Sequence, residues 1–341
     1  MTILTPKFAL INAIILTLIL TTYSQAEDSM LTKKPYFTYR IEASGALYEA
    51  KINGILLEDN FEGNALNFEQ PVNQYMRTGI NRIGIQVYPY ERGDFGTGRV
   101  TITLYVNQDG ASESKKKMVG QITFNAAEFF KNKQVSDAIQ TSMPKLRLDS
   151  ANDLIASESG DVIIQAAVAE SSKVEDDALW IYQDIELDTP FPVWGFFKAD
   201  KLDFPDVWED FVKNGEYYKK NLLTPLYQEH EKVIATLKTQ DFNKILPLFE
   251  ERNSEYDIAL YYPEGTYNEM LKKSLQDDFN DKSSELKLNE SKYARPTVSD
   301  DKGLIRLGTS AMIRFVNEEH SLYSKYPIWF YKKDGKWIIS R

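Results

Sequence analysis

The chain has no cysteine and only two histidines among its 341 residues. Without cysteine, neither a disulfide nor a thiolate ligand can form, so the fold must depend on its hydrophobic core. His230 and His320 lie far apart in the sequence, and zinc and copper sites therefore lack their usual ligands. His230-Glu231 begins like a metalloprotease helix, but Ile234 stands where the second histidine is required. We expect no cofactor and no metal of this class, and we interpret His230 as an exposed polar residue of its helix.

Motifs for nucleotide binding and nucleophilic catalysis are missing as well. Gly93, Gly96 and Gly98 lack the spacing of a phosphate-binding loop, and the neighbouring Asp94 would repel phosphate. The stretch Ser112-Glu113-Ser114-Lys115 has the Ser-x-x-Lys spacing of certain acyl enzymes, but in a hydrophilic loop where the lysine would stay protonated. The sequence therefore predicts no catalytic residue of these kinds.

Long apolar runs are missing except at the N-terminus, where Lys7 precedes an apolar stretch from Phe8 to Leu20. That length suits a secretion signal, whereas a membrane-spanning helix needs about 20 apolar residues. Small residues, Ser24 and Ala26, occupy the −3 and −1 positions of a cleavage site. We expect residues 1–26 to be a signal peptide cleaved after Ala26, and the mature chain to be periplasmic or secreted without stable membrane insertion. An uncleaved anchor is the alternative.

The chain has fewer basic residues than acidic ones, 40 against 50. Cleavage would remove Lys7 and no acidic residue, so the mature chain would carry a formal charge of −11. Nucleic acid and anionic membranes would repel such a protein, whereas a basic protein partner would not. Acidity that merely keeps the protein in solution is the simpler interpretation.

Residues 27–188 show mostly period-two alternation, which predicts an all-β sandwich. The dipeptide Asn53-Gly54 separates two apolar runs and predicts a hairpin with a type I′ turn. The stretch Tyr75 to Ile85 resembles the leucine-x-x-glycine-x-asparagine-x-isoleucine strand entry of jelly-roll domains of the galactose-binding-like type, with Met76 in place of the leucine. The resemblance implies a fold geometry and no particular ligand.

Aromatic residues gather in the segment 189–220, which we predict to be a connection packed against the body of the protein. Trp194, Phe196, Phe197 and Trp208 are candidates for a partner-binding or sugar-stacking surface, because aromatic side chains are favoured at interaction hot spots. The alternative is that these rings form an interdomain core.

Residues 221–341 predict an α+β domain, with helices first and a curved antiparallel sheet after them. A helical stripe runs from Leu222 to Leu237, Asp241 is a candidate N-cap of a second helix, and Thr266 to Phe279 predicts a third. Strands return after residue 303 and end in a hairpin around Lys332-Lys333-Asp334-Gly335. This region resembles the cone-shaped fold of the nuclear-transport-factor-like superfamily, which contains both enzymes and binding modules.

Carboxylates are the only plentiful reactive groups. Asp184, Glu186 and Asp188 alternate on one strand, and Glu175 to Asp177 lie in the preceding turn. These residues could bind calcium through oxygen ligands, or they could be the solvated face of an edge strand. The composition also permits a paired-carboxylate hydrolase.

Three functional classes stay open on the sequence. The first is an exported, non-enzymatic protein-binding protein, such as a periplasmic immunity protein or inhibitor that blocks a secreted antibacterial toxin. The second is an envelope-associated carbohydrate-binding or scaffold protein, and the third is the carboxylate hydrolase. We favour the first, with a protein partner, because motif-poor architecture is sufficient for occluding another protein's active site.

Overall fold

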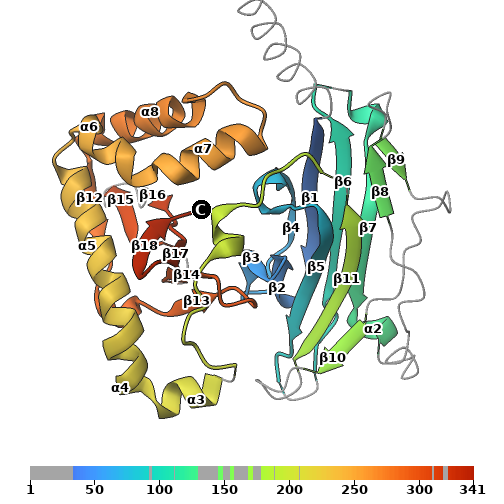
Figure 1. Cartoon of the computed structure of the whole chain (residues 1–341). Helices are drawn as coiled ribbons and strands as arrows, with labels where there is room; N and C mark the ends of the chain where they lie inside the picture. Colours follow the sequence, from blue (N-terminus) through green and yellow to red (C-terminus); the bar gives the residue numbers. More distant parts are fainter. Residues whose placement is uncertain are drawn as a thin grey trace, which may run out of the picture.

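The structure, a computed structural model, describes residues 34–91, 94–110, 112–129, 145–148, 154–156, 168–171, 178–187, 189–206, 208–308, 311–317 and 322–341. Some sequence predictions lie outside these residues, namely the signal peptide 1–26, the acidic turn Glu175 to Asp177, Asp188 and the loop with His320. The described residues form a strand-rich N-terminal half and a C-terminal half of helices followed by antiparallel strands (Figure 1).

The N-terminal half contains two sheets. The first has the strand order β4-β1-β6-β7, and its strands are β1 (Pro35–Ser44), β4 (Leu66–Pro71), β6 (Arg99–Gln108) and β7 (Lys117–Asn125). The second has the order β3-β2-β5-β11-β8-β9, with β10 also paired to β11; its strands are β2 (Leu47–Ile52), β3 (Ile55–Asn60), β5 (Gly79–Tyr88), β8 (Lys145–Leu148), β9 (Leu154–Ala156), β10 (Val168–Ser171) and β11 (Leu179–Leu187). Short helical turns are η1 (Asn73–Tyr75), η2 (Glu113–Lys115) and α2 (Ala126–Phe129). Pairing is antiparallel except between β8 and β11.

Alternation along the strands buries one face of each sheet, as the sequence predicts. In β1, Phe37, Tyr39 and Ile41 are fully buried, because successive side chains of a strand point to opposite faces. The buried faces of the two sheets meet: a Cβ atom on Gly120 of β7 would lie 2.5 Å from Ile185 Cδ1 of β11. The absence of a side chain at this glycine therefore allows the two sheets to approach closely.

Local turn chemistry explains two positions in this half, and the sequence predicts the first of them. Asn53 and Gly54 have φ of 51° and 77°, as a type I′ turn between β2 and β3 requires. Before β5, the fully buried Asn81 accepts a hydrogen bond from the Arg77 backbone N–H (3.0 Å) and donates to the Arg77 carbonyl oxygen (2.7 Å). The asparagine thus holds the loop in which Gly79 takes a φ of 95°. This is the stretch in which the sequence shows its jelly-roll resemblance.

Helical elements begin within the aromatic connection and continue after it. The helical elements are η4 (Gly195–Lys198), α3 (Trp208–Lys213), α4 (Gly215–Tyr218), the π-helical turn η5 (Lys219–Leu223), α5 (Thr224–Lys238), α6 (Phe242–Ile245), η6 (Leu246–Phe249), α7 (Glu250–Ala259), α8 (Thr266–Asn280) and η7 (Ser291–Tyr293). Asp241 caps α6, where its side chain accepts a hydrogen bond from the Asn243 N–H (3.1 Å). The predicted N-cap and the predicted third helix are both confirmed, whereas the sequence predicted no element for the stretch of α7.

The C-terminal strands form two antiparallel sheets, with orders β12-β15-β16 and β13-β14-β17-β18. The strands are β12 (Ser284–Leu288), β13 (Pro296–Val298), β14 (Leu304–Leu307), β15 (Ile313–Asn317), β16 (Leu322–Tyr326), β17 (Phe330–Lys333) and β18 (Lys336–Ile339). Asp334 and Gly335 have positive φ in the β17–β18 turn, so this predicted hairpin is confirmed. Sequence reasoning missed β12, β13 and β16, which are sheet neighbours of predicted strands.

Buried apolar residues form two clusters, and one of them extends across both halves. It combines the interior of the N-terminal sheets with Phe191, Trp194 and Phe196 of the connection and with Leu304 of β14 and Tyr331 of β17. The other cluster packs helices α5, α6 and α8 on the C-terminal strands. Within the described part of the chain, no helix has the length and apolar character needed to cross a membrane.

Candidate functional site

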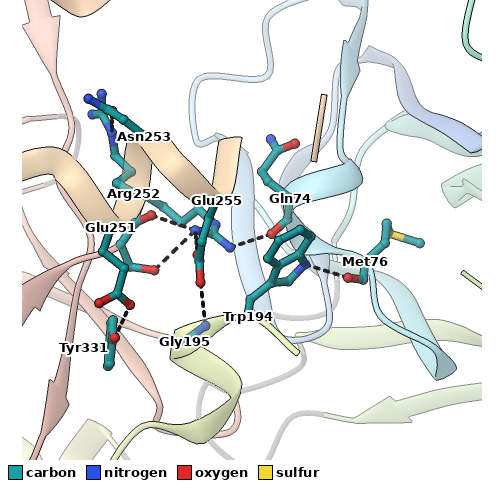
Figure 2. A network of polar contacts seen from close by, with 11 residues as sticks. Gln74, Met76, Trp194, Gly195, Glu251, Arg252, Asn253, Glu255 and Tyr331 are labelled. Carbon is teal, nitrogen blue, oxygen red and sulfur yellow. Dashed lines mark hydrogen bonds and ion pairs between the residues drawn. The ribbon is translucent and has the colours of Figure 1, made fainter. Parts of the chain in front are cut away.

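The connection is the layer between the two halves, and part of it is buried. Trp194 and Phe196 are each 1 % exposed. The Trp194 indole N–H donates to the Met76 carbonyl oxygen (2.7 Å) before β5, as Figure 2 shows. The Trp194 ring lies 5.8 Å from that of Phe191. These two predicted surface aromatics therefore belong to the junction core, which is the alternative that the sequence left open. A buried indole with its polar atom satisfied is a stable arrangement.

Arg341 completes this junction from the end of β18. Its guanidinium donates to the Glu255 carboxylate of α7 (2.5 Å) and to the Gln74 carbonyl oxygen of η1 (2.7 Å), and its side chain is only 1 % exposed. The other Glu255 oxygen accepts the Gly195 backbone N–H (2.6 Å), as Figure 2 shows. The Phe196 ring lies 4.5 Å from the guanidinium. One ion pair thereby joins the N-terminal half, the connection and the C-terminal half.

A second junction pair involves Tyr331 of β17, whose hydroxyl donates to the Glu251 carboxylate of α7 (Figure 2). Burial and the adjacent carboxylate raise the pKa of Tyr331 above its ordinary value, so the hydroxyl keeps its proton. A Cβ atom on Gly195 would meet both partners, at 2.3 Å from Glu251 Oε1 and 2.7 Å from Tyr331 Oη. The glycine therefore allows the connection to lie against this pair.

Two surface cavities open where the halves meet, and Asp300 lines both of them. We call the two together the junction groove. The smaller, of about 240 Å³, is lined by residues of the β2–β3 turn, of β5 and its entry loop, of β11, of the connection and of the loop between β13 and β14: Asn53, Gly54, Arg77, Ile80, Arg82, Asp184, Phe197, Asp300 and Asp301. Side chains more than 100 residues apart in the sequence thus share one cavity.

The larger cavity, of about 380 Å³, has an apolar wall and a charged rim. Phe204, Pro205, Trp208, Pro296 and Val298 supply the apolar wall. The charged groups are paired with one another: Lys51 with Glu49 (3.4 Å) and Asp300 (3.2 Å), and Lys302 with Asp206 (2.7 Å). Burial alone would lower the pKa of Lys51, but its two carboxylate neighbours raise it, so the ammonium group stays charged.

Trp208 remains at the surface, 41 % exposed, beside this cavity. Its ring stacks on Phe211 at 4.6 Å and 18°, and Phe211 in turn stacks on Tyr218 at 5.2 Å. Val212 and Tyr217 of the same two short helices are 64 % and 51 % exposed. We refer to Trp208, Val212 and Tyr217 as the Trp208 face. Of the four predicted surface aromatics, Trp208 is exposed and Phe197 is partly buried in the smaller cavity.

The acidic residue Asp184 is bound to an arginine and not arranged as a calcium ligand. Asp184 accepts two hydrogen bonds from Arg82, at 2.6 Å and 2.8 Å, so an arginine occupies both carboxylate oxygens. Asp188 lies outside the described residues. Among the residues that the structure describes, no group of three or more histidine, cysteine or acidic side chains is placed to hold a metal ion.

The interpretation of His230 as an exposed residue is wrong. The side chain is 1 % exposed and belongs to the buried stripe of α5, with Leu226, Val233 and Leu237. Its ring packs edge-on against Phe330 at 5.0 Å, and Nδ1 lies 3.0 Å from the Leu226 carbonyl oxygen. Burial lowers its pKa, so the ring is neutral. The position in the helical stripe was the signal that could have revealed this.

Sequence reasoning also missed Arg77, Arg341 and Glu255. Each is a single charged residue without a motif, and only contacts with distant segments distinguish it from other charged residues. No family model, no curated protein and no solved structure matches the chain.

Proposed function

We propose that this protein is a non-enzymatic binding protein that is exported and that holds a protein partner on the Trp208 face, in the manner of a periplasmic inhibitor or immunity protein. The observation that supports it is a tryptophan exposed to 41 % on the rim of a 380 Å³ cavity. Trp and Tyr are enriched at binding hot spots because they bury large areas while losing few rotamers.

The Trp208 face is organised before any partner arrives. Trp208 and Val212 are four residues apart on α3 and therefore lie on one side of the helix. The Trp208–Phe211–Tyr218 stack restricts the indole, so binding costs less side-chain entropy than for an isolated ring. The formal charge of −10 would attract a basic partner over long range.

Export and the two family resemblances are parts of the same proposal. The leader of residues 1–26 would direct the chain to the periplasm, where secreted toxins act. The helices followed by antiparallel sheets are the element order that the nuclear-transport-factor-like resemblance implies, and the two facing N-terminal sheets are what the jelly-roll resemblance implies.

The test is an affinity capture from envelope and secreted fractions of the source organism with the wild type, Trp208→Ala and Tyr262→Ala. Tyr262 is also 41 % exposed but follows α7, away from the junction groove, and serves as the matched control. We expect one stoichiometric protein on the wild type and on Tyr262→Ala, with at least tenfold weaker binding to Trp208→Ala. Equal retention of the captured protein by the wild type and both variants would refute the proposal that the Trp208 face binds the partner.

A carbohydrate-binding role is the second candidate, and one observation favours it. On the outer face of the second N-terminal sheet, the Trp180 ring lies over Gly84, where a Cβ atom would be 2.4 Å from the indole, and Tyr182 follows at 6.2 Å. Both rings are partly exposed, with Lys51 at 5.4 Å from the Trp180 ring and Arg82 at 3.9 Å from the Tyr182 ring. A sugar ring could stack on the exposed part of the indole while its hydroxyls bond to these cationic side chains. Retention of glycan without protein, lost in Trp180→Ala, would support this role.

A further inference from the structure

The smaller cavity of the junction groove contains five charged side chains, and four of them are balanced. Asp184 forms its two hydrogen bonds with Arg82, and Asp300 pairs with Lys51. Asp301 pairs with Lys201 at 2.8 Å. Burial would raise the pKa of Asp301, but Lys201, the Ser299 hydroxyl and the Gly303 N–H outweigh it and lower the pKa. All three carboxylates therefore already have cationic partners.

Arg77 is the remaining charged residue, and no acidic side chain in the described part of the chain pairs with it. Its guanidinium is nevertheless held in place. The Nε–H donates to the Ile80 carbonyl oxygen at 3.1 Å, and the guanidinium carbon lies 4.8 Å from the Phe197 ring. Asn81 fixes the Arg77 backbone through the two bonds described above. Hydrogen bonding and ring stacking therefore position an arginine whose terminal nitrogens have no carboxylate.

An apolar wall lies beside this guanidinium. The Ile80 side chain is 49 % exposed, and its carbonyl oxygen accepts the hydrogen bond from Arg77. The Phe197 ring lines the same cavity. The volume of about 240 Å³ has room for one terminal residue and not for a folded element. A planar, positioned guanidinium matches the two oxygens of a carboxylate.

We propose that the Arg77 cavity binds the carboxyl terminus of a polypeptide whose last side chain is apolar. The terminal carboxylate accepts hydrogen bonds from the Arg77 terminal nitrogens, and the apolar side chain packs on Ile80 and Phe197. This inference rests on the proposed function, because the polypeptide whose carboxyl terminus enters the junction groove would be the protein partner.

The test uses three defined ligands with the full chain: N-acetyl-alanyl-leucine with a free carboxylate, its carboxamide, and N-acetyl-glutamate α-amide. The second ligand lacks the charge, and the third carries it only on a side chain. Isothermal titration would be run on the wild type, Arg77→Met, Arg77→Lys and Arg99→Met. Arg99 is an exposed arginine of β6 that lines a different cavity, of about 510 Å³, and is the matched control.

We expect the free carboxylate ligand to bind with a dissociation constant of about 1 mM, the range that ligand efficiency allows for its size. The carboxamide and Arg77→Met should each weaken binding at least tenfold, Arg77→Lys should restore part of it, and Arg99→Met should stay within twofold. Equal binding of the acid and the carboxamide, or no effect of Arg77→Met, would overturn the inference. Tighter binding of the glutamate amide would reassign the site to an acidic side chain and so reject the carboxyl terminus.

Failure here is distinguishable from failure of the proposed function. If no ligand binds but Trp208→Ala still loses the captured protein, the Trp208 face stands and the Arg77 site is rejected. If the acid binds through Arg77 while capture is independent of Trp208, the protein partner must contact another surface.

Discussion

Trp194 and Trp208 belong to the same aromatic connection, yet they occupy opposite environments. Trp194 is 1 % exposed, and its indole N–H donates to the Met76 carbonyl oxygen. Trp208 is 41 % exposed and stacks on Phe211 of its own short helix, which in turn stacks on Tyr218. The first tryptophan joins the two halves, and the second is free to contact another molecule. A run of aromatic residues can therefore supply an internal core at one end and an exposed apolar surface at the other.

The difference arises from the partners that each end meets. Around Trp194, distant segments converge: Met76 from the N-terminal half, Glu255 from α7 and Arg341 after β18. Around Trp208, the neighbours include Pro205, Phe211 and Pro296, and one side of the cavity stays open. Buried area and satisfied polar atoms thus make the first end a stability element, whereas the second end retains exposed apolar area.

The largest effect should come from Trp194→Ala, because truncation leaves a cavity in the junction core. We expect a loss of about 3–5 kcal/mol in the free energy of unfolding, measured by urea denaturation. The same urea denaturation of Trp208→Ala provides the comparison. A loss below about 1 kcal/mol for Trp194→Ala would show that the junction core does not hold the two halves together.

Arg341→Met should have the next largest effect, about 3 kcal/mol, because it leaves the Glu255 carboxylate, 14 % exposed, without its cation. The exposed pair Lys232–Glu229 on α5 provides the control, since Lys232 is 69 % exposed and Lys232→Met should cost less than about 0.5 kcal/mol. Thermal and urea unfolding of both variants give the comparison. Similar losses for the two would mean that the buried pair contributes no more than a surface pair.

His230 should make stability depend on pH within the C-terminal half. Burial lowers its pKa, so the folded state prefers the neutral ring. Its contribution to the unfolding free energy is therefore complete above the pKa of a histidine in the unfolded chain, about 6.5, and is lost as the pH falls below that pKa. We expect the unfolding free energy of the wild type to drop more steeply between pH 6.5 and 5 than that of His230→Leu. Parallel pH profiles would contradict a neutral buried ring.

Trp208→Ala should have a much smaller effect on folding than Trp194→Ala, less than about 1 kcal/mol, because much of the side chain is already in water. Its effect on partner binding should nevertheless be at least tenfold, as the capture experiment measures. Destabilisation as large as that of Trp194→Ala would erase the contrast between the two ends of the connection and assign Trp208 to the core.

Local chemistry in the sequence was sufficient for much of the secondary structure. Asn53-Gly54 and Asp334-Gly335 predict their hairpins because few residues adopt positive φ at low cost. Helix α8 and the alternating strands β5, β6 and β11 follow from apolar periodicity. Strands β12, β13 and β16 escaped prediction because their five, three and five residues take their structure from sheet neighbours.

The candidate site was accessible to prediction only in part. Composition and periodicity marked Trp208, Phe197 and Asp184 as notable residues, and the structure places each of them at the junction groove. The same reasoning offered no way to separate Trp194 from Trp208. It also assigned His230 to the surface, although its position in the α5 stripe pointed inward.

The sequence by itself determined the turns, the helix starts, the strand periodicity and the absence of cysteine chemistry, because each depends on residues close together in the chain. Only the tertiary structure decided which aromatic rings are buried, that Arg82 occupies the Asp184 carboxylate, and that Arg341 joins Gln74 to Glu255. Those contacts link residues from 86 to 267 positions apart. Such pairs carry no local signal, since their energy exists only after the two halves have packed together.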